Sequence, residues 1–219
     1  MKENQLRTVL AELSKTVDTK TMYDAIATVY GELYEEDNDL KENRQIAAVL
    51  RAVRGTQVLD IGCGMGLLLR LIDLPPEDYL GIDISSGMIK NARHSFPHHI
   101  FLEDNLIHLS KVKLKSIDNA VCLFGAYNYI KDSTELATSI RNLHLRLKKN
   151  GKIFIMMLSP HHPSNKGEHI IWADGCEVLR TFTLREAEML FKPYFNKLEV
   201  KYFPPASGKN YITITGVKK

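Results

Sequence analysis

The sequence predicts an α/β protein built on a doubly wound, mostly parallel sheet that ends in an antiparallel hairpin. Residues 1–54 contain no proline and carry apolar side chains at helical spacing. From residue 56 onward, short apolar strands alternate with helices, the pattern of a parallel sheet covered on both faces. The last two apolar segments, 198–203 and 211–217, follow each other with no helix between them, which favours a hairpin at the sheet edge.

The first 54 residues predict three helices in succession. The first carries Leu6 and Leu13 on its apolar face, and the second begins near residues 19–21. The third runs from about residue 38 to Arg54, where a cation at the negative end of a helix and the following glycine make a good stop. We expect one domain over residues 1–219, with helices in 1–54 and a sheet core in 55–219.

The core elements follow from the change of hydrophobic period after Gly55. Strands are expected at residues 56–61, 79–84, 100–102, 116–124 and 152–158, and helices at residues 67–72, 86–95, 132–149 and 183–195. A long loop over residues 159–175 follows the fifth strand, and loops in such places often carry function.

Composition narrows the class of protein. The chain has 219 residues, of which 44% are hydrophobic. Its formal net charge of +3 is too small to indicate a nucleic-acid-binding protein by itself. The odd number of cysteines (Cys63, Cys122 and Cys176) without a Cys-x-x-Cys pair argues against disulfides and a zinc knuckle. We therefore expect a reducing, cytoplasmic location. No stretch approaches the 18 or so apolar residues needed to cross a bilayer, and the start of the sequence has no secretory signal.

A glycine turn over residues 60–66 carries the first chemical signal. Its sequence, Asp-Ile-Gly-Cys-Gly-Met-Gly, joins a predicted strand to a predicted helix, where the backbone can approach a ligand closely. The spacing is G-x-G-x-G and differs from the dinucleotide motif, and no P-loop is present. Asp60 would repel a pyrophosphate and favour an ammonium group. Asp83, 21 residues after Gly62, ends the second strand, where a carboxylate can accept hydrogen bonds from ribose hydroxyls.

Taken together, these motifs resemble the class I S-adenosylmethionine-dependent methyltransferases. The match to that family covers roughly residues 40–217. It includes the acid before G-x-G-x-G, the acid that ends the second strand, the Glu-Asp-Asn of residues 103–105, the segment 147–157 and the final hairpin. The resemblance implies a Rossmann-like, seven-stranded sheet with an N-terminal helical lid, S-adenosylmethionine as cofactor and S-adenosylhomocysteine as product. It implies these cofactor-binding residues: Asp60, Gly62, Cys63, Gly64, Gly66, Asp83, Ile84, Met88, Asp104, Asn105 and Phe124. For Ile84 and Met88 a role in the core is the alternative.

Three segments are expected to surround the methyl acceptor. The segment after the fourth strand offers Tyr127 and Asn128 to orient a polar group, although Tyr127 would equally serve to pack the next helix. The motif Y-D-x-x-A-x-x-Y from Tyr23 to Tyr30 resembles the lid of small-molecule methyltransferases, with core packing again the alternative. Substrate-binding residues are thus expected at Tyr23, Tyr30, Tyr34, Asn128 and, in the long loop, Trp172.

The catalytic candidates are His161 as a general base and Tyr127, although a surface role is the alternative for any loop histidine. Methyl transfer from a sulfonium is an in-line displacement, so no base is obligatory. We predict no metal, because His161, His162 and His169 lack a supporting carboxylate cluster.

The sequence thus predicts methyl transfer to nitrogen or oxygen of a small molecule by a monomer or homodimer that binds neither membranes nor nucleic acid. A methyltransferase for RNA or protein is a second hypothesis, for which Lys111, Lys113, Lys115, Lys131 and Lys166 are the candidate basic face. A third hypothesis is a catalytically silent nucleoside-binding protein. A fourth is an NAD-dependent oxidoreductase, and the glycine spacing counts against it. The acceptor itself is not predicted.

Overall fold

The computed structural model describes residues 18–30, 41–51, 56–162, 170–172, 175–177, 179–203 and 210–219. The helix predicted around Leu6–Leu13 and the residues Tyr34, Lys166 and His169 lie outside these ranges. Among the described residues, no helix is long and apolar enough to cross a membrane.

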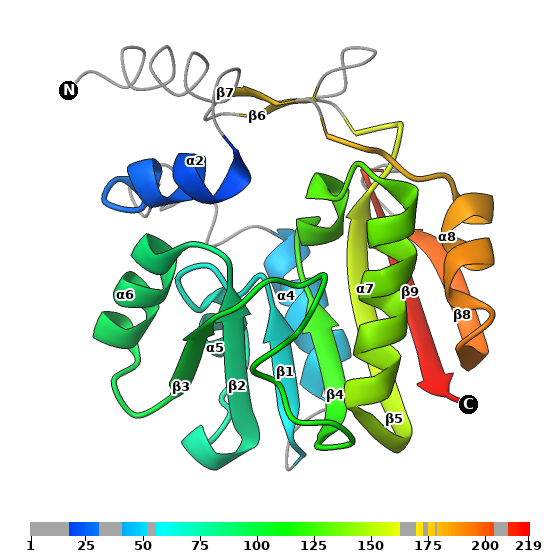
Figure 1. The fold of residues 1–219 in the computed structure, drawn as a ribbon, viewed down its shortest axis with the longest axis horizontal. Helices are drawn as coiled ribbons and strands as arrows, with labels where there is room; N and C mark the ends of the chain where they lie inside the picture. The colour runs from blue at the N-terminus through cyan, green and yellow to red at the C-terminus, as the bar shows by residue number, and fades with distance from the viewer. Residues whose placement is uncertain are drawn as a thin grey trace.

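One seven-stranded sheet forms the centre of the fold, with strand order β3-β2-β1-β4-β5-β9-β8 (Figure 1). Strands β1 to β5 pair in parallel, and β9 pairs antiparallel with both β5 and β8, so the sheet ends in the antiparallel hairpin that the sequence predicts. The strands are β1 (Val58–Ile61), β2 (Tyr79–Asp83), β3 (Ile100–Glu103), β4 (Ile117–Cys122), β5 (Leu147–Leu158), β8 (Phe195–Phe203) and β9 (Tyr211–Lys218).

Helices cover both faces of the sheet, which confirms the doubly wound architecture. They are α2 (Thr19–Ile26), α4 (Lys41–Leu50), α5 (Leu67–Leu71), α6 (Ser86–Ser95), α7 (Ser133–Arg146) and α8 (Leu184–Phe191), with short 3-10 turns η3 (Pro76–Asp78) and η4 (Ala126–Tyr129). One apolar cluster joins α4, α5 and α6 to one face, and a second joins α7 and α8 to the other.

The strand β5 illustrates why the apolar runs form a central strand. Its side chains alternate between the two clusters: Ile153, Ile155 and Met157 face α7 and α8, whereas Phe154, Met156 and Leu158 face the opposite layer. A strand that is apolar on both faces belongs in the middle of a sheet covered on both sides.

At two junctions between a helix and a strand, the boundaries differ from the prediction by several residues. Helix α7 ends at Arg146, before the expected residue 149, and β5 begins at Leu147 because its backbone pairs with Ile117 of β4. Helix α8 ends at Phe191, and Phe195 already belongs to β8, where it pairs with Lys218. In both places strand pairing overrides a sequence that favours helix.

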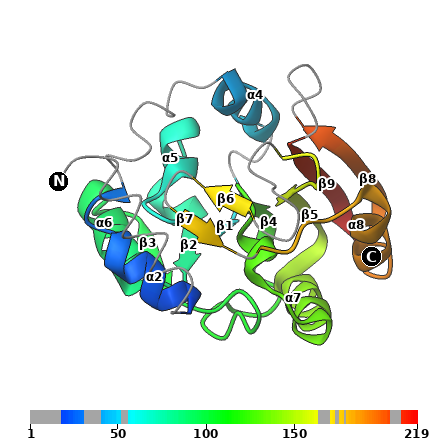
Figure 2. The ribbon, with the colours of Figure 1, turned by 90° about the horizontal axis from the view of Figure 1, so that it is seen from above.

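The loop predicted over residues 159–175 contains a short strand, β6 (Ile170–Trp172), that pairs antiparallel with β7 (Gly175–Glu177). This small second sheet lies on the same side as α2, above the carboxyl ends of the central strands (Figures 1 and 2).

The strand order reverses between β1 and β4: the chain builds outward from β1 to β3 on one side and from β4 to β5 on the other. At such a switch point the loops after neighbouring strands separate and leave room for a ligand. The glycine turn follows β1, Asp83 ends β2, Asp104 follows β3 and Phe124 follows β4. All of these predicted residues therefore lie at the same edge of the sheet.

Candidate functional site

The glycine turn requires glycine at each of its three G positions. Gly62, Gly64 and Gly66 have φ of +67°, +52° and +87°, a backbone region that disfavours other residues. A Cβ on Gly62 would lie 2.7 Å from that of Ala126, and one on Gly66 would lie 2.8 Å from the Phe96 ring. A Cβ on Gly64 would meet no described atom within 4 Å. Packing therefore explains two of the glycines, whereas Gly64 faces open space.

Asp83 is held at the end of β2 by two backbone amides. Gly64 N donates to Oδ2 at 2.9 Å, and Ser85 N donates to Oδ1 at 2.9 Å. Burial raises the pKa of this carboxyl, although the two amides act in the opposite direction. The carboxylate is thereby fixed between the glycine turn and the start of α6, on the wall of a pocket.

Asp60 is buried at the end of β1, with only 2% of its surface exposed. Tyr79 donates a hydrogen bond from its hydroxyl to Oδ2 at 2.8 Å. Burial raises the pKa of Asp60 to about 7 despite that hydrogen bond, and the nearby Asp83 raises it further. An acid in this state becomes a carboxylate readily when a cationic group approaches.

The raised pKa predicts how stability depends on pH. The folded state binds the Asp60 proton more tightly than the unfolded state, so the stabilisation is present at low pH and disappears as pH rises through about 7. Between pH 5 and pH 8 we expect the free energy of unfolding of the wild type, relative to Asp60→Asn, to fall by about 2–3 kcal/mol. In thermal unfolding, the melting temperature of the wild type relative to Asp60→Asn should fall by roughly 5–10 °C over the same pH range. Parallel pH profiles for the two proteins would contradict the argument.

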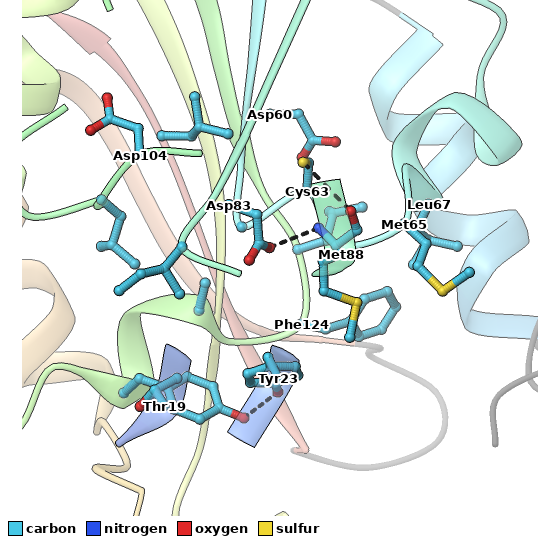
Figure 3. Close-up of a pocket in the computed structure, with 18 of the residues that line it drawn as sticks. Thr19, Tyr23, Asp60, Cys63, Met65, Leu67, Asp83, Met88, Asp104 and Phe124 are labelled. Atoms are coloured by element: carbon cyan, nitrogen blue, oxygen red, sulfur yellow. Dashed lines mark hydrogen bonds between the residues drawn. The ribbon is translucent and has the colours of Figure 1, made fainter. Parts of the chain in front are cut away.

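A pocket of about 600 Å³ opens over the switch point, and its size suits a nucleoside-sized ligand together with a second small molecule. Figure 3 shows Asp60, Cys63 and Asp83 on one side of it and Thr19 and Tyr23 on the other. The structure brings twelve predicted residues to its wall: Tyr23, Tyr30, Asp60, Gly62, Cys63, Gly64, Asp83, Ile84, Met88, Asp104, Asn105 and Phe124. Gly66 is not among the lining residues and acts through the shape of the turn.

Asp104 lines the pocket, but its carboxylate is occupied by the loop that follows. Oδ1 accepts hydrogen bonds from Asn105 N and from the Ser110 hydroxyl, each within 2.9 Å, and Oδ2 accepts one from Lys111 N at 2.8 Å. The contact with an adenine amine that the resemblance implies therefore stays a prediction. In this structure the visible task of Asp104 is to shape the loop after β3.

Three predicted residues do not reach the pocket. Tyr127 is fully buried among the α7 and α8 side chains, with its ring against Phe191, so the structure favours the packing alternative. Asn128 donates to Arg180 O and accepts from Leu158 N, which ties the η4 turn to β5. His161 is exposed, with its ring against Tyr202. For Tyr127 and Asn128 the cause is η4, a tight turn that directs Ala126 and Tyr129 to the pocket and the two residues between them to the core.

Trp172 lies in β6, and nothing is described of its side chain. The alternative histidine, His162, is buried, and burial lowers its pKa. Its ring contacts Tyr211, which lines the pocket, but His162 itself does not.

Sequence reasoning missed several lining residues, of which Tyr129 and Lys20 are the most informative. The hydroxyls of Tyr129 and Tyr23 share a hydrogen bond of 2.5 Å, so the turn after β4 meets α2 on the side of the pocket opposite Asp83. Lys20 Nζ lies 3.0 Å from both Asp24 Oδ2 and Glu103 Oε1. The sequence could have indicated Tyr129 as a pocket residue, because it lies in the segment 124–129 that follows the fourth strand. Nothing in the sequence indicates that Lys20 pairs with Glu103. The remaining missed residues include Asn43, Arg70, Leu106, Ile107, Ile130, Glu135 and Tyr211.

Among the described residues, no group of three histidine, cysteine or acidic side chains is placed to hold a metal ion.

Comparison with known proteins agrees with this geometry. A family model described as a methyltransferase domain matches residues 59–153, which contain the glycine turn and the ends of β1 to β4. An uncharacterized protein of Methanocaldococcus jannaschii is 30% identical over 141 residues, which cover 64% of this chain and 51% of that protein. A trans-aconitate 2-methyltransferase of Afipia carboxidovorans is 33% identical over 75 residues, 33% of this chain and 29% of the relative. The chain thus spans about half the length, or less, of these curated relatives.

Among solved structures, the fold is similar to that of an amino pentose methyltransferase from Micromonospora echinaspora with S-adenosylmethionine bound. The TM-score is 0.63 at 18% identity, and the match covers 86% of this chain and 96% of that one. This likeness is one of fold.

Proposed function

We propose that the chain is a class I S-adenosylmethionine-dependent methyltransferase, since its residues 59–153 match a methyltransferase domain, and that it transfers a methyl group from S-adenosylmethionine to nitrogen or oxygen of a small-molecule acceptor. One observation carries the proposal. A pocket at the switch point of the sheet has Asp83 fixed on its wall by Gly64 N and Ser85 N, beside a glycine whose missing side chain leaves space open.

The residues present fit this cofactor. Asp83 offers two carboxylate oxygens to a ribose diol, Asp60 offers a readily ionised acid to an ammonium group, and Gly64 leaves room for close approach. Apolar side chains such as Ile84 and Met88 supply a surface for a purine. When bound, S-adenosylmethionine supplies an electrophilic methyl group, so the chain's own tasks are to orient the acceptor and exclude water.

The side of the pocket opposite Asp83 is proposed to hold the acceptor. Tyr23 and Tyr129 present a hydrogen-bonded pair of phenols, and the Tyr30 ring lies 6.1 Å from that of Tyr23. A phenol both donates and accepts hydrogen bonds, so the pair suits a neutral amine or hydroxyl. Aromatic faces also attract a group that carries positive charge.

The charges on the pocket disfavour a carboxylate as acceptor. Among the described lining residues the cations are Lys20 and Arg70, and Lys20 is already shared between Asp24 and Glu103. Trans-aconitate, named in several relatives, is a polycarboxylate and would meet few compensating charges among these residues. No histidine is among the described lining residues, which favours an amine, because an amine needs no base at the moment of transfer. We therefore propose an amine as the preferred acceptor.

An RNA or protein substrate has less support. Of the lysines that the sequence offers as a basic face, Lys111, Lys113, Lys115 and Lys131 are described, and none lines the pocket. Lys111 Nζ instead donates to the backbone oxygen of Glu103.

The proposal is tested by binding first and turnover second. Calorimetry should show binding of S-adenosylmethionine and S-adenosylhomocysteine and none of NAD. A panel of amines, alcohols and carboxylic acids is then tested as acceptors, and turnover is measured as formation of S-adenosylhomocysteine. We expect turnover among the amines. Binding of NAD, or of no adenosyl ligand, would overturn the proposed function, and turnover confined to carboxylic acids would overturn the acceptor class.

The phenol pair makes a separate prediction. Tyr23→Phe and Tyr129→Phe should each lower the rate of acceptor methylation by about tenfold, since about 1.4 kcal/mol of hydrogen bonding to the acceptor is lost. The affinity for S-adenosylhomocysteine should change less than about twofold. Tyr194→Phe is the matched control, because Tyr194 packs against His144 outside the pocket. An unchanged rate in both pocket variants would remove the phenols from acceptor binding.

A further inference from the structure

Helix α2 is fastened to the start of α6 by one carboxylate. Asp24 Oδ1 accepts hydrogen bonds from the Ser85 hydroxyl at 2.7 Å, from Gly87 N at 2.9 Å and from the Ser86 hydroxyl at 3.2 Å. Burial would raise the pKa of Asp24, but the Gly87 amide, Ser85 and Lys20 outweigh it and bring the pKa to about 2. The carboxylate is therefore ionised and lies at the positive end of a helix, which favours it.

The packing around Asp24 shows that α2 and α6 are built to meet. The two helices lie side by side in both views (Figures 1 and 2). A Cβ on Gly87 would lie 2.7 Å from that of Ala27, so glycine at this place lets the helices approach. Ile26 and Met88 complete a small apolar cluster between them. Asn91 Nδ2 also donates to the backbone oxygen of Ala27.

Ser85 connects this junction to the pocket. Its hydroxyl donates to Asp24 and accepts from Met88 N at 3.1 Å, while its own backbone N donates to Asp83. Ser85 is fully buried. A continuous chain of hydrogen bonds thus runs from the carboxylate on α2, through a single residue, to the carboxylate on the pocket wall.

Two further contacts place α2 over the carboxyl ends of neighbouring strands. Lys20 bridges Asp24 to Glu103 at the end of β3, and Tyr23 bonds Tyr129 after β4. Asp83 and Glu103 are paired in the register of β2 and β3. Helix α2 therefore contacts the end of β3 and the turn after β4, and β3 pairs with the end of β2 that carries Asp83.

We propose that Asp24 is a positioning residue that couples closure of α2 over the pocket to the orientation of Asp83 through Ser85. This rests on the proposed function, because it takes Asp83 as the residue that binds the cofactor's ribose. Asp24 touches no ligand in this scheme; it fixes the hydroxyl of Ser85, and thereby the backbone amide that aims the carboxylate.

The test is a double-mutant cycle on the full chain with Asp24→Ala, Ser85→Ala and both together. Ser85→Ala keeps the backbone N–H to Asp83 and removes only the hydroxyl in the middle of the chain. Each single variant should weaken binding of S-adenosylhomocysteine by about tenfold, and the double variant by about the same factor, because the two side chains act in one path. Unchanged affinity in Asp24→Ala, or a double variant with the product of the two effects, would overturn the proposal.

Two readouts separate positioning from general damage. With the 2′,3′-dideoxy analogue of S-adenosylhomocysteine the loss in Asp24→Ala should vanish, because the analogue lacks the hydroxyls that Asp83 would bind. Thr183→Ala is the matched control: it removes the hydroxyl that caps α8, far from the pocket, and should leave both affinities unchanged. An equal loss for both ligands would show that Asp24 supports the fold only and would overturn the proposal.

Hydrogen exchange of the ligand-free protein supplies a measurement that does not depend on the cofactor. The amides of Gly64 and Ser85, which hold Asp83, should exchange at least tenfold faster in Asp24→Ala than in the wild type and in Thr183→Ala. If the wild type binds no S-adenosyl ligand, the proposed function fails, while the exchange result still decides whether α2 and the Asp83 junction are coupled. Equal exchange in all three proteins would overturn that coupling.

Discussion

Asp83→Ala should weaken binding of S-adenosylmethionine and S-adenosylhomocysteine at least 100-fold. The carboxylate is held on the pocket wall by Gly64 N and Ser85 N, so its oxygens are fixed before a ligand arrives. A hydrogen bond to a charged group contributes about 1.5–3 kcal/mol, and a ribose diol makes two, which together give roughly 3–6 kcal/mol. That range corresponds to between about 10² and 10⁴ in affinity. Calorimetric titration of both ligands measures it.

The matched control for this experiment is Asp118→Ala. Asp118 also accepts from a backbone amide, that of Gln57 at 3.0 Å, and it pairs with Lys148 at 2.8 Å. It lies at the amino end of β4, away from the pocket. Both variants should remain folded, because losing such contacts costs about 1–3 kcal/mol against a total stability of about 5–15 kcal/mol. Equal losses of affinity in the two variants would argue that Asp83 acts only through stability.

The central strands were predictable because their sequence leaves little choice. Residues 58–61 are buried without exception, and β5 is apolar on both faces, which fits only a strand covered on both sides. The glycine turn was predictable for a similar reason: Gly62 and Gly66 have positive φ and no room for a side chain. Since parallel strands place their carboxyl ends at one edge, the pocket's position followed from the strand order.

Element boundaries were less predictable, because pairing across the sheet competes with local preference. Residues 147–149 have good helix formers, yet Leu147 joins β5 through its pairing with Ile117, 30 residues earlier. The next residues turn the chain: Asn150 has a φ of +64°, and a Cβ on Gly151 would lie 2.9 Å from the backbone oxygen of Lys148. No local pattern in the sequence reveals a partner at that separation.

The acceptor side was predicted least well, since it depends on how one short turn is oriented. The sequence indicates Tyr127 as a candidate and not Tyr129, but η4 buries Tyr127 in the core and directs Tyr129 to the pocket. Asp24 belongs to the motif from Tyr23 to Tyr30, in which the sequence pointed to the tyrosines only. The hydrogen-bond partners of Asp24 lie 61 to 63 residues away, at the start of α6. Contacts between elements of this kind are decided by packing.

Gly64→Ala should abolish cofactor binding while leaving the protein folded. The backbone at Gly64 has a φ of +52°, so an alanine there costs about 1–2 kcal/mol of strain. That cost lowers the melting temperature by roughly 2–8 °C for a chain of this size. The added methyl meets no described atom, and it enters the open space beside Asp83 that we assign to the ligand. We expect the affinity for S-adenosylhomocysteine to fall at least 100-fold, which is more than about 2.7 kcal/mol.

Gly62→Ala provides the comparison, since it adds the same strain to the same turn in a different environment. Its Cβ would lie 2.7 Å from the Ala126 Cβ, and both atoms are fixed by backbone, so the turn or η4 must shift. Overpacking of this kind costs about 1–3 kcal/mol beyond the strain. We expect Gly62→Ala to melt clearly below Gly64→Ala, as measured by thermal unfolding without ligand.

The two variants together separate the shape of the turn from the space it encloses. Because positive-φ strain is common to both, the difference between their melting temperatures reports the contact with Ala126, and the affinity of Gly64→Ala reports whether the ligand occupies the space beside that glycine. If Gly64→Ala binds S-adenosylhomocysteine as the wild type does, that space is not part of the cofactor site. If the two variants melt together, the closeness of Gly62 to Ala126 does not constrain the turn.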